Sequence, residues 1–288
     1  MATHTRAALR QANAERPDAE YALVVGLYVA ALLTPVVMLG LARAIADAAI
    51  LYISFLGAVT GITIVAGWAV SRTPGLAVSL GRRDATWLLA VVPFAWFVGV
   101  FGAAAVVGVE PPGIAALLAM VATVGGLFLG LILTTMSRTR HAAATLEGVD
   151  DLAQWEARWP PRWRRVSVGV AVIASVGYVG GIVAQVAFGV DWAGSLYLLM
   201  FLWTPLAGAV NPRTFRVTEA GLVVERPLQQ QFRPWSAFAS YDLTDDTLVI
   251  RPTAWWRPAH RCDRADIEDV DAAVTALNQC SQEFSPTD

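Results

Sequence analysis

Between Tyr21 and Val210 the chain alternates between long apolar blocks and shorter polar connectors. A helix needs about 20 apolar residues to cross a hydrocarbon core of about 30 Å, and its backbone polar groups are then satisfied within the helix. Six stretches reach this length without a charged residue or a histidine. They predict six transmembrane helices arranged as three hairpins, at 21–42, 50–70, 86–109, 113–136, 166–190 and 192–210.

Arginines lie almost entirely on one side of this arrangement. The amino-terminal segment 1–20 and the connectors 71–85 and 137–165 carry twelve arginines, whereas the opposite connectors carry only Arg43. Basic residues accumulate in the cytoplasmic loops of membrane proteins. The pattern therefore predicts a multi-pass protein of the cell (plasma) membrane with both termini in the cytoplasm.

After Arg213 the long apolar blocks give way to short alternating runs separated by turn residues. Such alternation is typical of strands that bury one face. Strands are expected at 214–218, 222–226, 230–233, 238–243 and 247–251 and around 260–262. A closing helix with Asp266 as its N-cap is expected next, because apolar residues recur there on one helical face: Ile267, Val270, Val274 and Leu277. Residues 213–288 are thus predicted to form a small cytoplasmic α+β domain.

The order of these features resembles the PH-like domains of prokaryotic membrane proteins. The resemblance rests on the run Thr214–Leu222, on Trp235 followed by Phe238, on the hairpin Asp245–Ile250 and on the final helix. It implies a module that binds or scaffolds and that has no active site. Phosphoinositide-binding PH domains carry clustered basic residues between their first strands, whereas this chain has Glu219, Ala220 and Gly221 there, so inositide binding is not implied. No family resemblance is seen for the six apolar stretches.

The connector 137–165 is too long for a simple turn. Asp150 is placed as an N-cap, and Leu152, Trp155 and Trp159 then recur at helical spacing before Pro160, which predicts a short amphipathic helix in the membrane interface. With part of the tail, this connector forms a candidate surface for the membrane or a partner: Trp155, Trp159, Arg162, Trp163, Arg164, Arg165, Trp255, Trp256 and Arg257. The alternatives are simple anchoring before the fifth helix, and packing of Trp255 and Trp256 beneath the sheet.

Polar and helix-breaking residues inside the six stretches are few. Gln185 is the most polar side chain there, and prolines are expected to kink or loosen three of the helices. The candidates for a pathway or for helix packing are Gln185, Pro35, Pro93 and Pro205. Glycines four residues apart are expected to let helices approach closely, at Gly57 and Gly61, Gly126 and Gly130, and Gly177 and Gly181. A carboxylate marks each short outer turn, at Asp47, Glu110 and Asp191; we interpret these as turn residues, with a cation-attracting ring as the alternative.

The chemistry that this composition disfavours is informative. Ionisable residues inside a membrane mark proton relays, transport pathways and intramembrane catalysis, and the six stretches contain none. His260 and Cys262 are interpreted as core or edge positions and not as metal ligands, because no second pair matches them. We therefore predict no catalytic, cofactor-binding or metal-binding residues. The net charge of −2 gives no indication of a nucleic-acid partner.

Composition agrees with this interpretation: 56% of residues are hydrophobic and 15% are charged, against about 45–50% and about 25% in soluble domains. The sequence favours a non-enzymatic integral membrane protein whose cytoplasmic PH-like domain mediates interaction or assembly with a protein or a membrane surface. Its expected partners are the lipid bilayer and a protein, either a different one or a second copy. The alternative is a channel or transporter subunit with the tail as a regulatory domain.

Overall fold

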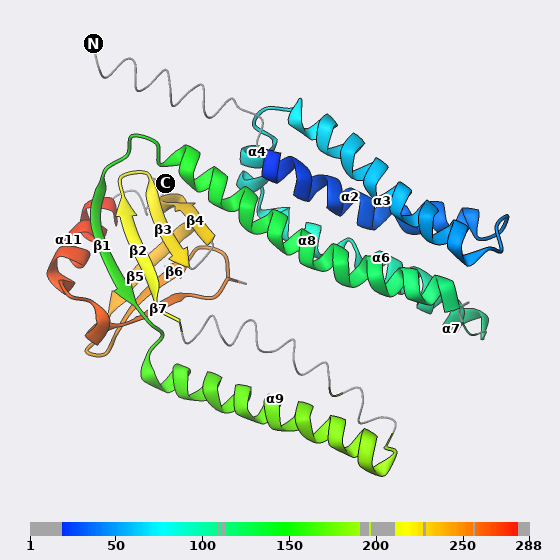
Figure 1. The fold of residues 1–288 in the computed structure, drawn as a ribbon. Coiled ribbons are helices and arrows are strands. Elements are labelled where there is room, and N and C mark those ends of the chain that lie inside the picture. Colours follow the sequence, from blue (N-terminus) through cyan, green and yellow to red (C-terminus); the bar gives the residue numbers. More distant parts are fainter. Residues whose placement is uncertain are drawn as a thin grey trace. The chain divides into compact units, whose positions relative to one another are not determined.

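The computed structural model describes residues 19–108, 110, 113–190, 196, 211–226, 229–255 and 257–281 (Figure 1). The chain divides into two compact units, Met1–Thr145 and Leu146–Asp288. The first unit is built from apolar helices. The second combines a long apolar helix with two antiparallel sheets.

Helices α2 (Ala19–Leu41) and α3 (Ala48–Ser71) form the first hairpin, and α2 also packs on α8 (Gly113–Thr145). The carboxylate of Asp47 caps α3, because its Oδ1 accepts hydrogen bonds from the backbone N–H of Ala49 and Ile50 at 2.8 and 3.0 Å. These hydrogen bonds within the turn account for an acidic residue at position 47.

The third apolar stretch is a broken helix. Its pieces Ala85–Val91 and Phe94–Val107 are bent by 41° at Pro93. The stretch runs through a 3₁₀ turn η1 (Asp84–Trp87), helices α5 (Leu88–Val91) and α6 (Phe94–Phe97), a π-helical turn η2 (Val98–Gly102) and α7 (Ala103–Val107). A proline has no N–H and its ring clashes with the preceding turn, which accounts for the break. A short helix α4 (Leu76–Arg82) precedes it and packs on α8.

The broken helix packs closely against two glycines of α8, Gly126 and Gly130. A Cβ at Gly130 would lie 2.2 Å from the carbonyl oxygen of Leu89, and one at Gly126 would lie 2.7 Å from the ring of Pro93. Only glycine allows an approach this close, so the expected packing role of this pair is confirmed. A Cβ at Gly57 or Gly61 on α3 would meet nothing within 4 Å.

Four helices are long and apolar enough to cross a membrane, and the bent pair makes a fifth if it is one span. They match the first five predicted stretches, although α8 continues to Thr145 and α9 (Pro161–Phe188) begins earlier than expected. The stretch 192–210 lies outside the described residues apart from residue 196. Many large apolar side chains on these helices are exposed, as is typical of surfaces that face lipid.

The sheet unit holds two antiparallel sheets. The first has the order β1-β2-β3-β4, with strands β1 (Asp151–Ala157), β2 (Arg213–Thr218), β3 (Gly221–Arg226) and β4 (Gln229–Pro234). After a 3₁₀ turn η4 (Trp235–Ala237), the second sheet has the order β5-β6-β7, with β5 (Phe238–Leu243), β6 (Thr247–Pro252) and β7 (His260–Asp263). A turn η5 (Arg264–Asp266) and the helix α11 (Val270–Ser281) complete the unit.

One apolar core lies between these elements. Its largest side chains are Trp155, Phe215, Trp235 and Phe238, all at most 5% exposed, and α11 adds Ala273, Ala276, Leu277 and Cys280. The N-cap of α11 is Asp269, whose Oδ1 accepts from the N–H of Ala272 at 2.8 Å. The expectation that Asp266 caps this helix was wrong: Asp266 ends η5, and its carboxylate accepts from the backbone N–H of Arg158.

The amphipathic helix expected around Asp150–Trp159 was also wrong, because residues 151–157 form strand β1. Trp155 and Ala157 point into the core while Gln154 and Glu156 are exposed, which is a period of two. Trp155 is 5% exposed and stacks on Phe215 at 5.8 Å between ring centroids, so it is a core residue and not part of a membrane surface. The distant strand β2 supplies the pairing, and this overrides the local helical spacing.

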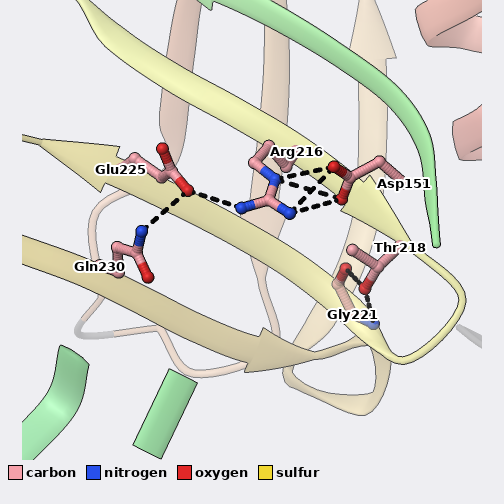
Figure 2. Close-up of polar contacts among 6 residues, drawn as sticks. All are labelled: Asp151, Arg216, Thr218, Gly221, Glu225 and Gln230. Atoms are coloured by element: carbon pink, nitrogen blue, oxygen red, sulfur yellow. Dashed lines mark hydrogen bonds and ion pairs between the residues drawn. The ribbon is translucent and has the colours of Figure 1, made fainter. Parts of the chain in front are cut away.

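The sheet domain is therefore discontinuous in sequence, and its predicted boundary at residue 213 was too late. β1 precedes α9 and β2 follows it, yet the two strands pair antiparallel, with Ala157 opposite Arg213 and Glu156 opposite Thr214. Figure 2 shows the polar network on the outer face of this pairing: the guanidinium of Arg216 binds both carboxylate oxygens of Asp151, at 2.9–3.1 Å, and Oε1 of Glu225 at 2.8 Å.

Asp151→Asn is expected to weaken the attachment of β1. A bidentate arginine–carboxylate pair is stronger than a neutral hydrogen bond. These side chains are only 25–32% exposed, so the expected loss, after allowance for solvent screening, is about 1 kcal/mol. Hydrogen exchange of the β1 and β2 amides in the full-length protein measures it. Asp242→Asn is the matched control, because the Asp242–Arg251 ion pair is 3.5 Å long and its side chains are more than half exposed. If Asp151→Asn and Asp242→Asn change the exchange equally, the Arg216–Asp151 ion pair does not hold β1 on β2.

Candidate functional site

The candidate site lies where the sheet domain passes into α9. The backbone N–H of Arg158 donates to Oδ2 of Asp266 at 2.9 Å, and the N–H of Asp263 donates to the carbonyl of Arg158 at 2.8 Å. Pro161 then occupies the first helical position of α9, where its missing N–H costs nothing. The start of α9 is thus tied to the β7 end of the second sheet.

Arginines and tryptophans alternate around this junction. The guanidinium of Arg213 lies 5.3 Å from the ring centre of Trp159, and those of Arg261 and Arg162 lie 5.8 and 5.9 Å from Trp163. Cation–π contacts of this length fix the rings beside the charges. Of the predicted surface residues, the structure brings together Trp159, Arg162, Trp163, Arg164 and Arg165 on the last connector residues and first turns of α9.

A second group of arginines lies on the inner face of the first sheet. Arg213 continues the buried row of Phe215 and Val217 on β2 and is 8% exposed. Arg226 ends β3 beside it, where the sheet opens to solvent, and Arg233 on β4 pairs with Leu222 of the buried row. These residues are not among the site residues predicted from the sequence, although the alternation of Arg213 with Phe215 already places the arginine on the apolar face.

His260 on β7 faces this group. It is 9% exposed, and its ring lies 6.1 Å from Phe215 and 6.2 Å from Phe238. Its Nε2 atom has no hydrogen-bond partner. Burial lowers the pKa of His260 to about 3, and repulsion by Arg233, Arg213 and Arg226 contributes further. Burial, followed by repulsion from Arg226, also lowers the pKa of Arg213 to about 10. We call Arg213, Arg226, Arg233 and His260 the arginine–histidine cluster.

Cys262 lies on the same strand and is fully buried, and burial raises its pKa to about 12. The described residues hold no group of three or more histidine, cysteine or acidic side chains that could bind a metal. In the core, Cys262 and Cys280 are buried thiols that form no disulfide.

The loop that leads into β7 carries the other predicted surface residues. Trp255 is 89% exposed and Arg257 is partly buried, whereas Trp256 lies outside the described residues. Trp255 therefore does not pack beneath the sheet, which removes that alternative for this residue. A tryptophan this exposed is typical of a contact with another molecule or with lipid headgroups.

A cavity of about 910 Å³ lies beside the junction, between the first turns of α9 and the β5–β6 turn. Arg162, Arg165 and Arg264 line it together with Asp245, Asp246 and Asp263. Its charges are of both signs, in contrast to the arginine–histidine cluster.

The break at Pro93 is surrounded by hydrogen bonds from neighbouring helices. Pro93 cannot donate to the carbonyl of Leu89, and the hydroxyl of Tyr28 on α2 donates to that oxygen instead, at 2.7 Å. Thr123 donates to the carbonyl of Pro93 at 3.2 Å, and Thr134 donates to that of Thr86 at 3.0 Å. An apolar cavity of about 520 Å³ lies beside the break, next to Trp96.

The remaining pathway candidates lie on α2, on α9 and in the stretch 192–210. Pro35 is buried within an uninterrupted α2, and Gln185 is exposed near the end of α9. Pro205 lies outside the described residues. Pro35 and Pro93 belong to the first unit, and Gln185 belongs to the second.

No protein-family model, curated protein or solved structure matches the chain.

The buried state of His260 makes the sheet domain less stable in acid. The unfolded histidine takes up a proton near pH 6.5, whereas the folded one stays neutral to about pH 3, so stability falls as pH decreases through this window. We expect a loss of about 1 kcal/mol between pH 7 and 5.5. Hydrogen exchange of β6 and β7 in the full-length protein measures it. In His260→Gln this contribution should disappear; an unchanged pH slope would show that another group is responsible.

Tyr28→Phe removes the donor that replaces Pro93 and leaves the Leu89 carbonyl unsatisfied. The expected destabilisation of the helical unit is about 1 kcal/mol, measured by thermal unfolding of the detergent-solubilised protein. Tyr52→Phe is the control, because Tyr52 is 63% exposed on α3. If both variants unfold at the same temperature as the wild type, the Tyr28 hydroxyl does not stabilise the broken helix.

Proposed function

We propose that this chain is a non-enzymatic integral protein of the plasma membrane, with six spans and cytoplasmic termini. Its discontinuous, PH-like sheet domain lies against the inner leaflet and docks there through arginine and tryptophan. The observation that carries the proposal is the pairing of Ala157 with Arg213 across the insertion that contains α9.

This pairing supports an even number of crossings within the insertion. α9 rises about 1.5 Å per residue and is long enough to cross a hydrocarbon core once. Since Arg213 lies beside Ala157, the chain has to return to the side it left. The apolar stretch 192–210 is the part of the sequence suited to that return, which gives six spans in total.

The two sheets support the PH-like interpretation. Strands β2, β3 and β4, then the fully buried Trp235, then strands β5 to β7 and the closing helix α11 follow the order on which the resemblance was based. Strand β1 is an addition to that order. Within this interpretation the helical insertion occupies the connection between the first two strands. In the proposed arrangement the end of β1 and the start of β2 are therefore attached to the membrane at the same place.

Charge supports the lipid surface as the partner. The cytoplasmic leaflet is anionic, and each basic residue near it contributes about 1 kcal/mol. Arg158, Arg162 and Arg165 are exposed at the junction, and Trp159 and Trp163 are the amphipathic rings favoured at headgroup level. Arg261 connects β7 to Trp163, and the loop before β7 presents the exposed Trp255.

The broken helix at Pro93 favours a second candidate, a channel or transporter subunit regulated by the sheet domain. Transporters place broken helices at binding sites. Here, however, the carbonyls of Leu89, Pro93 and Thr86 accept hydrogen bonds from Tyr28, Thr123 and Thr134, so the break is stabilised from within. We therefore rank transport second.

A fluorophore attached to the introduced cysteine of the Trp255→Cys variant tests docking. The label is selective, because Cys262 and Cys280 are buried and should not react in the folded protein. The full-length protein is placed in nanodiscs of phosphatidylcholine with or without phosphatidylglycerol, each containing a lipid-borne quencher. We expect quenching that increases with the anionic lipid and decreases in the double variant Arg162→Gln, Arg165→Gln.

The control is a fluorophore on Thr275→Cys, on the exposed side of α11. Equal quenching at both positions, or none at position 255, would contradict docking. Flux of an ion or solute through liposomes that is lost in Pro93→Ala would favour the second candidate. Stable co-purification of a protein in place of lipid quenching would assign the surface to a protein partner.

A further inference from the structure

The cavity at the start of α9 is lined by charges of both signs that do not neutralise one another. Its charged lining residues in the described part of the chain are three arginines and three aspartates: Arg162, Arg165, Arg264, Asp245, Asp246 and Asp263. Opposite charges attract, yet among the described residues Arg162 and Arg165 form no ion pair with these aspartates. The volume of about 910 Å³ lies within the range of small-molecule sites. Opposite charges are therefore held apart across a space of ligand size.

The arginine side of the cavity is fixed by the start of α9. Pro160 and Pro161 line the cavity there and restrict the backbone that leads into the helix. No side chain caps this helix. Uncapped N–H groups give the beginning of a helix a partial positive charge, which adds to the charges of Arg162 and Arg165. This side of the cavity is suited to an anion.

The aspartate side is fixed by the β5–β6 turn. The N–H of Thr244 donates to the carbonyl of Thr247 at 2.9 Å, and the N–H of Thr247 donates to the hydroxyl of Thr244 at 3.1 Å. The N–H of Arg264 donates to the carbonyl of Asp246 at 3.0 Å. The backbone of the turn is thus held in place, while in the described part of the chain the carboxylates of Asp245 and Asp246 have no hydrogen bond or ion pair. This side is suited to a cation that donates N–H bonds.

A ligand that carries both charges fits the two sides together. Arginine matches phosphate oxygens with parallel N–H groups, and a primary ammonium offers three donors to carboxylates. A ligand with only an anionic group would leave the aspartates unpaired and would be repelled by them. The complementary ligand is therefore a phosphate joined to a primary ammonium.

The position of the cavity indicates a phospholipid as the source of this group. α9 is apolar and long enough to cross a membrane, and Arg162 and Arg165 lie in its first turns. In the proposed arrangement these arginines are at the level of the headgroups. In an ethanolamine phospholipid the phosphate is joined to the glycerol and the ammonium is at the outer end. The same order is present here, with arginines on the helix that enters the lipid and aspartates on a turn of the sheet domain.

We propose that this cavity binds the headgroup of an ethanolamine phospholipid of the inner leaflet. The phosphate lies at Arg162 and Arg165, and the primary ammonium lies at Asp245 and Asp246. This deepens the proposed function and rests on it, since it names the headgroup that the docked domain recognises. It differs from the attraction of exposed arginines to an anionic surface, because it distinguishes headgroups of equal net charge.

Hydrogen exchange of the amides of Thr244, Thr247 and Arg264 in the full-length protein tests the site, because all three are hydrogen-bonded in or beside the turn. Nanodiscs of phosphatidylcholine and phosphatidylglycerol are compared with nanodiscs in which phosphatidylethanolamine replaces the phosphatidylcholine. The net charge of the surface is the same, but the methyl groups of choline remove the N–H donors of the ammonium. A ligand that binds only the folded turn slows exchange, and we expect about a tenfold slowing with phosphatidylethanolamine.

A second arm separates the lipid from its free headgroup. Detergent-solubilised protein receives glycerophosphoethanolamine, which carries the same group without acyl chains. Slowing in the phosphatidylethanolamine nanodiscs supports the lipid, whether or not the soluble compound also slows exchange. Slowing by the soluble compound alone would overturn the lipid as the source.

The double variant Asp245→Asn, Asp246→Asn separates binding from a structural role. Asparagine is well tolerated in turns, so exchange in the phosphatidylcholine nanodiscs should be unchanged, and the slowing by phosphatidylethanolamine should be lost. Asp242→Asn is the matched control, because Asp242 is exposed, is paired with Arg251 and does not line the cavity. It should keep the full response. If the double variant exchanges faster in phosphatidylcholine, Arg162→Gln decides, since it removes the opposite charge without changing the turn.

Four results would overturn the site: equal exchange in the two kinds of nanodisc, slowing that persists in the double aspartate variant, slowing that persists in Arg162→Gln, or loss of slowing in Asp242→Asn. The last would mean that the net charge of the domain is responsible. If the fluorophore at position 255 is still quenched in anionic nanodiscs while any of these results holds, docking stands and only the headgroup site fails. Slowing without quenching at position 255 would contradict docking through Trp255 and leave the headgroup site.

Discussion

The antiparallel pairing of β1 with β2 is the constraint on which the rest of the sheet unit depends. Strand β1 ends at Ala157, the chain then runs through α9, and the partner strand begins only at Arg213. Because the two residues are neighbours, everything between them has to leave and return at one place. This constraint places the junction residues beside Arg213, brings Trp155 onto Phe215, and gives the sheet domain two attachments to its apolar insertion.

Such a pairing is costly for a flexible chain, because the entropy lost on closing a loop grows with its length, by about 0.6 kcal/mol per doubling. A long rigid helix within the loop reduces the number of conformations that have to be given up. The remaining cost is opposed by specific contacts at both ends of β1. Arg216 holds Asp151 at its start, and Arg158 is bonded to Asp266 and Asp263 just after its end. The three partners of Asp151 and Arg158, which are Arg216, Asp263 and Asp266, all come from the sequence beyond residue 212. The register of β1 is therefore set by the part of the domain that follows the insertion.

Much of this fold could be predicted from the sequence, and the failures have a common physical cause. Long charge-free runs identify the apolar helices because length and composition alone decide them, and strands β2 to β6 are visible in the alternation between Thr214 and Arg251. β1 was assigned to a helix because Leu152, Trp155 and Trp159 fit a helical spacing, while its partner strand lies beyond an entire apolar helix.

The arginine–histidine cluster was missed for a related reason. Its four residues, Arg213, Arg226, Arg233 and His260, are far apart in sequence, and only the pairing of the strands and the packing of the sheets bring them together. Tyr28 could not be connected to Pro93 without the structure for the same reason.

The choice of arginine has a further physical consequence at the junction. The chain contains no lysine, and arginine keeps its charge even where burial lowers its pKa, which for Arg213 falls only to about 10. His260 stays neutral down to about pH 3. The charge of this end of the domain is therefore constant over the physiological pH range, since neither group titrates within it. Attraction between this end of the domain and an anionic surface would consequently change with lipid composition and ionic strength, which alter the potential of the surface, and not with pH in this range.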